Sequence, residues 1–114
     1  MQTIIAEERF CYTARDGSMR STKIYLRAPY QLADAEWGCY CHVEELLEKE
    51  VRTHGDNSIQ ALCLAIAFVK LLLQRFEEQG VLFYYPEDTS APVEAAYLFG
   101  DNMSLFQKDG VGLE

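Results

Sequence analysis

The sequence predicts an α+β domain in which an antiparallel sheet of four or five strands packs on one long helix in the C-terminal half. Strand-like runs fill the first half of the chain and the helix follows them, whereas a parallel sheet would need strands and helices to alternate. The 114 residues, of which 49% are hydrophobic, suffice for one core. We expect a single domain over residues 1–99 and a C-terminal tail over residues 100–114, whose closing Leu113-Glu114 resembles a cloning remnant.

The chain begins with two predicted strands, over residues 3–14 and 19–28, joined at an Asp16-Gly17 turn signal. A two-residue loop would place Phe10 opposite Lys23. A three-residue loop over residues 16–18 places Phe10 opposite Ile24 instead. This second register brings four apolar side chains to one face of the hairpin: Phe10, Tyr12, Ile24 and Leu26. Because a one-residue slip would expose half of this set, the sequence favours the three-residue loop with a bulge.

A third strand is expected over residues 37–43, after a connection over residues 29–36. Alternation along this strand puts the Cys39 and Cys41 thiols on one face and the His42 side chain on the other. Residues 44–52 suit either a helix or a turn followed by a short fourth strand over residues 49–54. We favour the strand, because three strands alone would leave much of the long helix uncovered.

The long helix is predicted over residues 58–79. Asn57 can cap its first turn, Gln60 can reach back toward the preceding chain, and Gly80 suits the position after its last residue. The predicted apolar stripe consists of Ile59, Leu62, Ile66, Val69, Leu73 and Phe76. Further apolar residues widen this stripe, so we expect the C-terminal segment or a second copy of the chain to cover the helix on another side. Residues 81–86 are predicted as a strand, residues 87–92 as a loop and residues 93–99 as a short element on the helix.

The net charge of −8 is unevenly distributed, with +2 over residues 1–30 and −10 over residues 31–114. Phosphate backbones repel such a protein, so direct nucleic-acid binding is not expected. The segment 34–50 holds six acidic residues and one basic residue, Lys49. We interpret the six as a surface that binds a basic partner protein, with a merely solvated surface as the alternative. They are Asp34, Glu36, Glu44, Glu45, Glu48 and Glu50.

No arrangement of residues in the sequence indicates catalysis. Cys39, Cys41 and His42 invite a metal interpretation, but the thiols have Cys-x-Cys spacing on one strand and the histidine diverges from both. Cys63 and His54 are not placed as a nucleophile–base pair, and glycine-rich phosphate loops and hydrolase motifs are absent. We therefore predict no enzymatic activity, no metal and no cofactor. Cys39, Cys41 and Cys63 are expected to be free, buried thiols.

Neither a signal peptide nor a membrane span is expected. The first residues lack a basic region followed by a long apolar one, and the longest apolar stretch, between Gln60 and Gln74, contains Lys70. The sequence thus predicts a cytoplasmic protein without membrane contacts, in which the cysteines stay reduced.

The sequence resembles a bacterial domain family of unknown function in four short stretches. These stretches are the Asp16-Gly17 hairpin, the strand end at Ala28-Pro29, the Trp37-x-Cys39 strand and the helix start Gly55-x-x-Ser58-Ile59-Gln60-Ala61-Leu62. The family's helix start is typically Gly-Val-Asp-Ser-Leu-Gln-Ala-Leu, so Asp56 stands in place of valine and Asn57 in place of aspartate, which preserves the capping chemistry. The resemblance covers residues 3–85. It implies an α+β fold and carries over no catalytic residue.

On these grounds we expect a non-enzymatic protein-binding domain. The small size, the lack of a catalytic signature and the acidic segment fit an immunity protein that neutralises a bacterial toxin. Toxins that cleave nucleic acid are typically basic, so an acidic inhibitor is complementary to them. The alternative is a homodimeric structural or regulatory domain.

Overall fold

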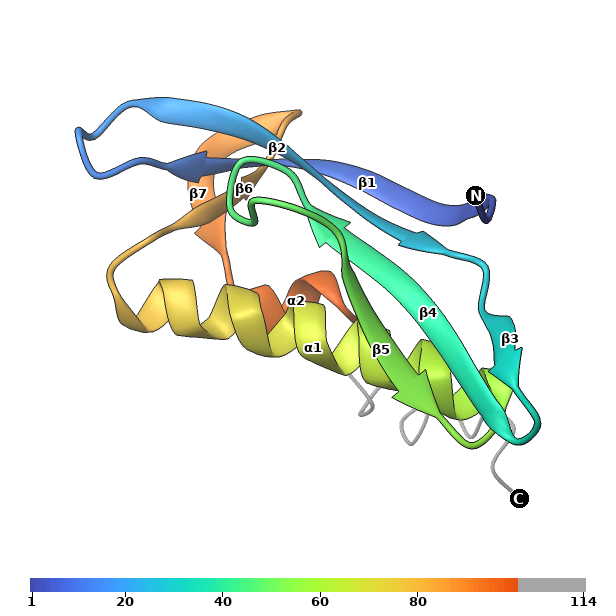
Figure 1. The fold of residues 1–114 in the computed structure, drawn as a ribbon. Coiled ribbons are helices and arrows are strands. Elements are labelled where there is room, and N and C mark those ends of the chain that lie inside the picture. Colours follow the sequence, from blue (N-terminus) through green and yellow to red (C-terminus); the bar gives the residue numbers. More distant parts are fainter. Residues whose placement is uncertain (101–114) are drawn as a thin grey trace, which may run out of the picture.

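Seven antiparallel strands form one sheet over the main helix, α1, in the computed structural model, which describes residues 1–100 (Figure 1). The strands are β1 (Ile4–Thr13), β2 (Met19–Arg27), β3 (Tyr30–Ala33), β4 (Glu36–Val43), β5 (Val51–Gly55), β6 (Phe83–Tyr85) and β7 (Asp88–Val93). The helices are α1 (Ser58–Glu78) and the short α2 (Ala95–Leu98). The α+β class is confirmed, but the expected number of four or five strands is wrong. The predicted tail lies, apart from Gly100, outside the described residues.

β4 has strands paired along both of its edges. β5 pairs with one edge, while β3 and β2 pair with the two halves of the other edge. From β2 the sheet continues through β1 and β6 to β7. β3 and β7 were not predicted from the sequence, because both lack the usual strand signals. β3 has only four residues, directly after Pro29, and β7 contains Pro92, which strands tolerate at the edge of a sheet.

The β1–β2 hairpin has a three-residue loop, as predicted, but the loop begins one residue earlier. The Ala14 N–H donates to the Ser18 carbonyl at 2.8 Å and the Gly17 N–H donates to the Ala14 carbonyl at 2.9 Å, so residues 15–17 form the loop. Gly17 occupies the third loop position with a φ of +83°. Loops of this kind need a left-handed residue there, and glycine adopts that conformation without strain.

The earlier loop moves the β1–β2 register by two residues from the predicted one. Phe10 lies opposite Thr22 and not opposite Ile24. Because side chains alternate along a strand, a shift by two residues keeps each side chain on its predicted face. Phe10, Tyr12 and Ile24 are buried together on the side facing α1, and Leu26 packs partly buried against them. The apolar pattern therefore identified the buried face of the hairpin, whereas the position of Gly17 in the loop determined the pairing register of β1 and β2.

α1 begins and ends where its capping residues predict, to within one residue. The Asn57 side chain accepts from the Gln60 N–H at 2.8 Å, and the Gln60 side chain accepts from the Asp56 N–H at 2.6 Å. At the other end Gly80 has a φ of +97°. The N–H of the residue after Gly80 donates to the Phe76 carbonyl at 3.0 Å, which completes a Schellman motif.

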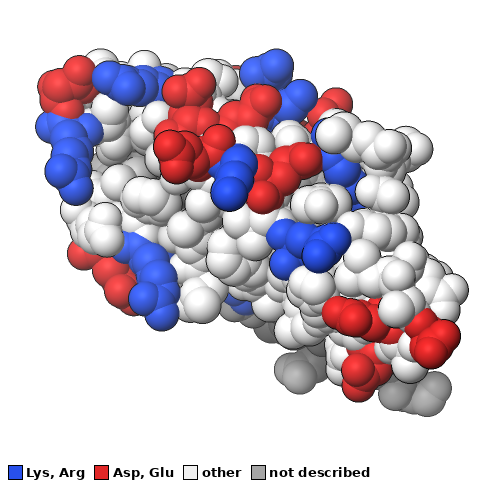
Figure 2. Space-filling view, in the orientation of Figure 1, with Lys and Arg blue, Asp and Glu red and all other residues white. Residues whose placement is uncertain are grey.

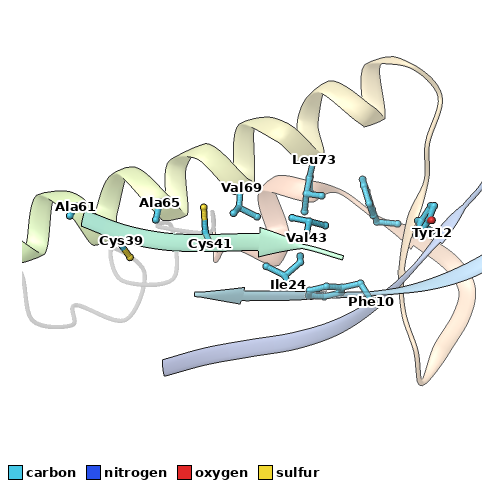
Figure 3. Close-up of a cluster of buried hydrophobic side chains, with 12 residues drawn as sticks. Phe10, Tyr12, Ile24, Cys39, Cys41, Val43, Ala61, Ala65, Val69 and Leu73 are labelled. Atoms are coloured by element: carbon cyan, nitrogen blue, oxygen red, sulfur yellow. The ribbon is translucent and has the colours of Figure 1, made fainter. Parts of the chain in front are cut away.

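One row of residues on α1 faces the buried side chains of β4 (Figure 3). The row is Ala61, Ala65, Val69 and Leu73, and it packs in one cluster with Cys39, Cys41 and Val43. The predicted stripe is therefore right for Val69 and Leu73 and wrong for Ile59, which is exposed. Because Ala61 and Ala65 have small side chains, the helix backbone can approach the sheet closely on their side. The buried side of α1 is therefore the side that carries the two alanines.

Residues 44–50 form a loop before β5, so the fourth-strand prediction is confirmed and the helix alternative is wrong. After β7, α2 packs beside α1, where the Ala95 N–H donates to Glu77 Oε2 at 2.7 Å. The C-terminal segment thus covers one further side of α1. The side of α1 that faces away from the sheet keeps apolar residues exposed.

Candidate functional site

The β4–β5 loop carries three of the six carboxylates predicted to bind a partner. We call residues 44–50 the acidic loop; within it Glu45 and Glu48 are exposed and Glu44 is half-buried. Within residues 1–100, these three carboxylates form no ion pair. Their negative charges are therefore not neutralised by the described part of the domain.

The backbone of the acidic loop is anchored to the core. Leu46 and Leu47 pack against the buried cluster, and their N–H groups donate to the Val43 carbonyl at 3.3 and 2.9 Å. The Thr22 hydroxyl donates to the Glu44 carbonyl. Because these contacts hold the loop in one conformation before binding, little conformational entropy of the loop is lost when a partner binds it.

Glu45 adopts a left-handed backbone conformation with a φ of +71°, the only positive φ outside glycine in residues 1–100. For residues other than glycine this conformation costs on the order of 1–2 kcal/mol. Such strain gathers at binding and active sites, where the surrounding structure enforces it. A glutamate at a position that suits glycine favours a role for its carboxylate beyond the fold.

Glu50 also lies in the acidic loop, but it fastens the loop to β2. Its Oε1 accepts from the Nε of Arg27, and both side chains are largely buried. Burial alone would raise the pKa of Glu50, but hydrogen bonds from Arg27 and Tyr25 outweigh it and hold the pKa below its ordinary value. Arg27 also lies over the Tyr25 ring, 5.2 Å from its centroid. Glu50 therefore offers a partner no free carboxylate.

Asp34 and Glu36 lie at the opposite end of β4 from the acidic loop. The eight residues of β4 separate the two groups by roughly 26 Å, at about 3.3 Å per residue. Glu36 Oε1 lies 2.8 Å from Nδ1 of His54 on β5. Figure 2 shows one group of acidic atoms in the upper part of this face and another at its lower right, with uncharged and basic atoms between. The Debye length is about 8 Å at physiological ionic strength, so the six predicted residues do not act as one surface.

The side of α1 away from the sheet is a second candidate surface. We define the α1 outer face as the exposed apolar residues Ile59, Cys63, Leu64, Ala67 and Leu71, which share one side of the helix. Ile59 is 73% exposed, Leu64 44% and Leu71 49%. An 18-residue window of α1 has a mean hydropathy of 1.7, so by length and composition alone the helix could cross a membrane, but core helices of soluble proteins are often as apolar. Exposed apolar side chains gathered on one face are typical of a contact surface.

The four cysteines are free thiols, and no group of three or more His, Cys, Asp and Glu side chains in residues 1–100 is placed to hold a metal ion. Cys39 and Cys41 are fully buried against α1, but Cys63 is exposed, so the prediction of a buried Cys63 is wrong. Cys63 lies on the outer side of α1 because it falls between buried Ala61 and Ala65. Burial, followed by the neighbouring Cys39 and by Glu50, raises the pKa of the Cys41 thiol to about 12.

A thiol reagent should modify Cys63 rapidly in the native protein, and Cys39 and Cys41 only after unfolding. The thiolate is the reactive species, and a buried thiol with a raised pKa forms almost none of it near pH 8. Peptide mass spectrometry after a short reaction measures the modification at each cysteine. Equal rates at Cys39 and Cys63 would contradict the burial of Cys39.

Comparisons with protein-family models, with curated proteins and with solved structures find no match. The resemblance to a bacterial domain family of unknown function therefore stays a prediction based on the quoted residues.

The residues that hold the acidic loop in place were not predicted from the sequence. Leu46 and Leu47 form an apolar pair inside an acidic run, and this pair was the available signal that the run is anchored to the core. The contact between Glu50 and Arg27 spans 23 residues and leaves no pattern in the sequence. The left-handed conformation of Glu45 has no sequence signal either, because glutamate is not a residue that prefers it.

Proposed function

We propose that this chain is a non-enzymatic protein-binding domain whose acidic loop docks on a basic surface of its partner. The observation that carries the proposal is an anchored loop that presents Glu44, Glu45 and Glu48 without ion-pair partners among residues 1–100. The strained backbone of Glu45 supports it, because the fold alone would be served better by glycine. Asp34, Glu36 and Glu50 are left out of this surface, for they lie far from it or are bound within the domain.

Neutralisation of a bacterial toxin is the most concrete form of this proposal. A toxin that cleaves nucleic acid needs a basic surface to bind its substrate, and a preformed acidic loop is complementary to such a surface. An inhibitor that covers the surface performs no chemistry of its own. The net charge of −8 adds long-range attraction to the contact.

Replacing Glu44, Glu45 and Glu48 together by glutamine should slow association with the partner on the order of tenfold at low salt, because exposed charges mainly govern the association rate. A pull-down from the source organism at low salt supplies the partner. Stopped-flow measurements then give the association rate at about 50 and 150 mM salt. We expect the wild-type rate to fall as salt rises and the rate of the variant to change little.

A triple variant elsewhere provides the matched control. Exchanging Glu78, Glu87 and Glu94 for glutamine removes the same charge from exposed positions outside the acidic loop. This control should associate at nearly the wild-type rate. If both variants are slowed equally, only the overall charge matters. If the acidic-loop variant associates at the wild-type rate, the proposed docking surface is wrong.

A homodimer formed through the α1 outer face is the second candidate function. Its three large exposed side chains, Ile59, Leu64 and Leu71, lie around the small Ala67. A small residue at the centre lets two helices approach to the 8–10 Å at which helices pack. A second copy presents the same apolar face. In a dimer with two-fold symmetry, the α1 outer face of each copy would therefore cover that of the other.

Replacing Leu64 and Leu71 by glutamate should abolish such a dimer, because each copy would bring two charges into the contact. Sedimentation analysis distinguishes the monomer of 13.0 kDa from a species of twice that mass. Leu82→Glu is the matched control, since Leu82 is also exposed but lies outside α1. A wild-type chain that sediments as a monomer at high concentration would exclude this candidate.

A further inference from the structure

A cavity of about 520 Å³ opens between the β1–β2 hairpin and the C-terminal end of α1. Its apolar walls come from the hairpin, the acidic loop, α1 and the chain after α1, through Tyr12, Ala14, Leu46, Phe76 and Val81. Its volume lies within the roughly 300–1,000 Å³ of pockets that hold small molecules. The cavity is distinct from the exposed carboxylates of the acidic loop, none of which lines it.

Tyr12 contributes a polar group without a partner to this cavity. The residue is only 5% exposed, and its hydroxyl forms no hydrogen bond within residues 1–100. Figure 3 shows Tyr12 at the Leu73 end of the buried cluster, and Tyr12 also lines the cavity. The Tyr12 hydroxyl is not among the buried polar atoms that lack a partner in residues 1–100, so it is accessible from the open cavity and can donate to a bound molecule.

Two arginines stand at the same cavity. Arg20 lies directly opposite Tyr12 in the hairpin, which places both side chains on the same face of the sheet. Arg20 Nη2 lies 3.5 Å from Asp16 Oδ2, while Arg15 forms no ion pair in the described part of the chain. Hydrogen bonds from Ser18 hold the pKa of Asp16 below its ordinary value, so its charge offsets one arginine and leaves the other uncompensated.

We propose that this cavity binds a small organic carboxylate with an apolar body. The apolar walls receive the body, the Tyr12 hydroxyl donates a hydrogen bond to the carboxylate, and Arg20 and Arg15 supply the positive charge. Arg15 and Arg20 outnumber the one lining carboxylate, Asp16, so the local charge favours an anion at this place although the net charge of the protein is −8. The acidic loop contributes only the apolar Leu46 to this cavity, so the proposal does not depend on the protein-binding function or on the carboxylates of that loop.

The test is an NMR titration of the ¹⁵N-labelled full chain with 3-phenylpropionate, and with the neutral 3-phenyl-1-propanol as the matched ligand. We expect saturable shifts of the amides of Ala14, Arg15, Gln79 and Val81. The dissociation constant of the carboxylate should be about 1 mM or lower, as is usual for ligands of this size. The alcohol should bind on the order of tenfold more weakly, because it lacks the charge.

Two variants and a control locate the site. Tyr12→Phe removes only a hydroxyl that has no partner among residues 1–100, so the fold is kept, and Arg20→Gln removes one charge. Each should weaken binding of 3-phenylpropionate by roughly tenfold. Arg9→Gln removes a charge from the other face of β1 and should leave the affinity unchanged. The proposal is overturned if the shifts do not saturate, if acid and alcohol bind equally, or if Tyr12→Phe binds as the wild type does.

Discussion

Replacing Leu73 by alanine is expected to lower the free energy of unfolding by about 2–5 kcal/mol, the range for a leucine lost from a packed core. Leu73 is 0% exposed and is among the largest fully buried side chains of the domain. It lies in the buried row of α1 one turn after Val69 and packs in the same cluster as Val43 of β4.

Urea denaturation followed by circular dichroism measures this effect as a lower midpoint with an unchanged slope. Leu71→Ala is the matched control on the same helix, since Leu71 is 49% exposed and its loss should change the stability by only about 0.5 kcal/mol. Equal losses for the two variants would mean that α1 is buried on its outer side as well. That outcome would support a dimer through the α1 outer face.

The ends of α1 were predictable because capping depends on a few neighbouring residues. Asn57, Gln60 and Gly80 specify hydrogen bonds within one turn of the chain, and the structure forms each of them. The buried face of α1 was less predictable. Nearly every residue between Ala61 and Leu73 is apolar, so periodicity does not single out one side, and it gives alanine less weight than leucine.

The arrangement of the acidic residues shows a different limit. Six carboxylates within 17 residues are close in sequence, but the predicted strand over residues 37–43 already lies between Glu36 and Glu44. An extended strand separates its ends by the full length of the chain that forms it. The sequence therefore contained the information that the six residues divide into two groups. The pairing of Glu50 with Arg27 did require the structure, because it depends on how β2 and β4 align.

Replacing Gly55 by alanine is expected to destabilise the domain by about 1–3 kcal/mol or more, the cost of forcing an extra methyl group into a packed site. Gly55 ends β5 and is buried against the first turn of α1. A Cβ atom at this position would lie 2.6 Å from the backbone nitrogen of Ala61 and 3.0 Å from its Cα. These are backbone atoms of a capped helix, so the clash is relieved only by moving α1 away from the sheet.

Gly38→Ala tests whether this loss comes from backbone contact and not from the loss of glycine itself. A Cβ atom at Gly38 would meet Arg52 Cδ at 3.0 Å and Leu32 Cδ1 at 3.1 Å, which are side-chain atoms and can shift more easily than the backbone of a helix. Its loss of stability should therefore be clearly smaller than that of Gly55→Ala in the same urea denaturation. The close approach of β5 to α1 explains physically why glycine stands at position 55 in this chain. A Gly55→Ala variant as stable as the wild type would show that β5 and α1 do not approach each other this closely.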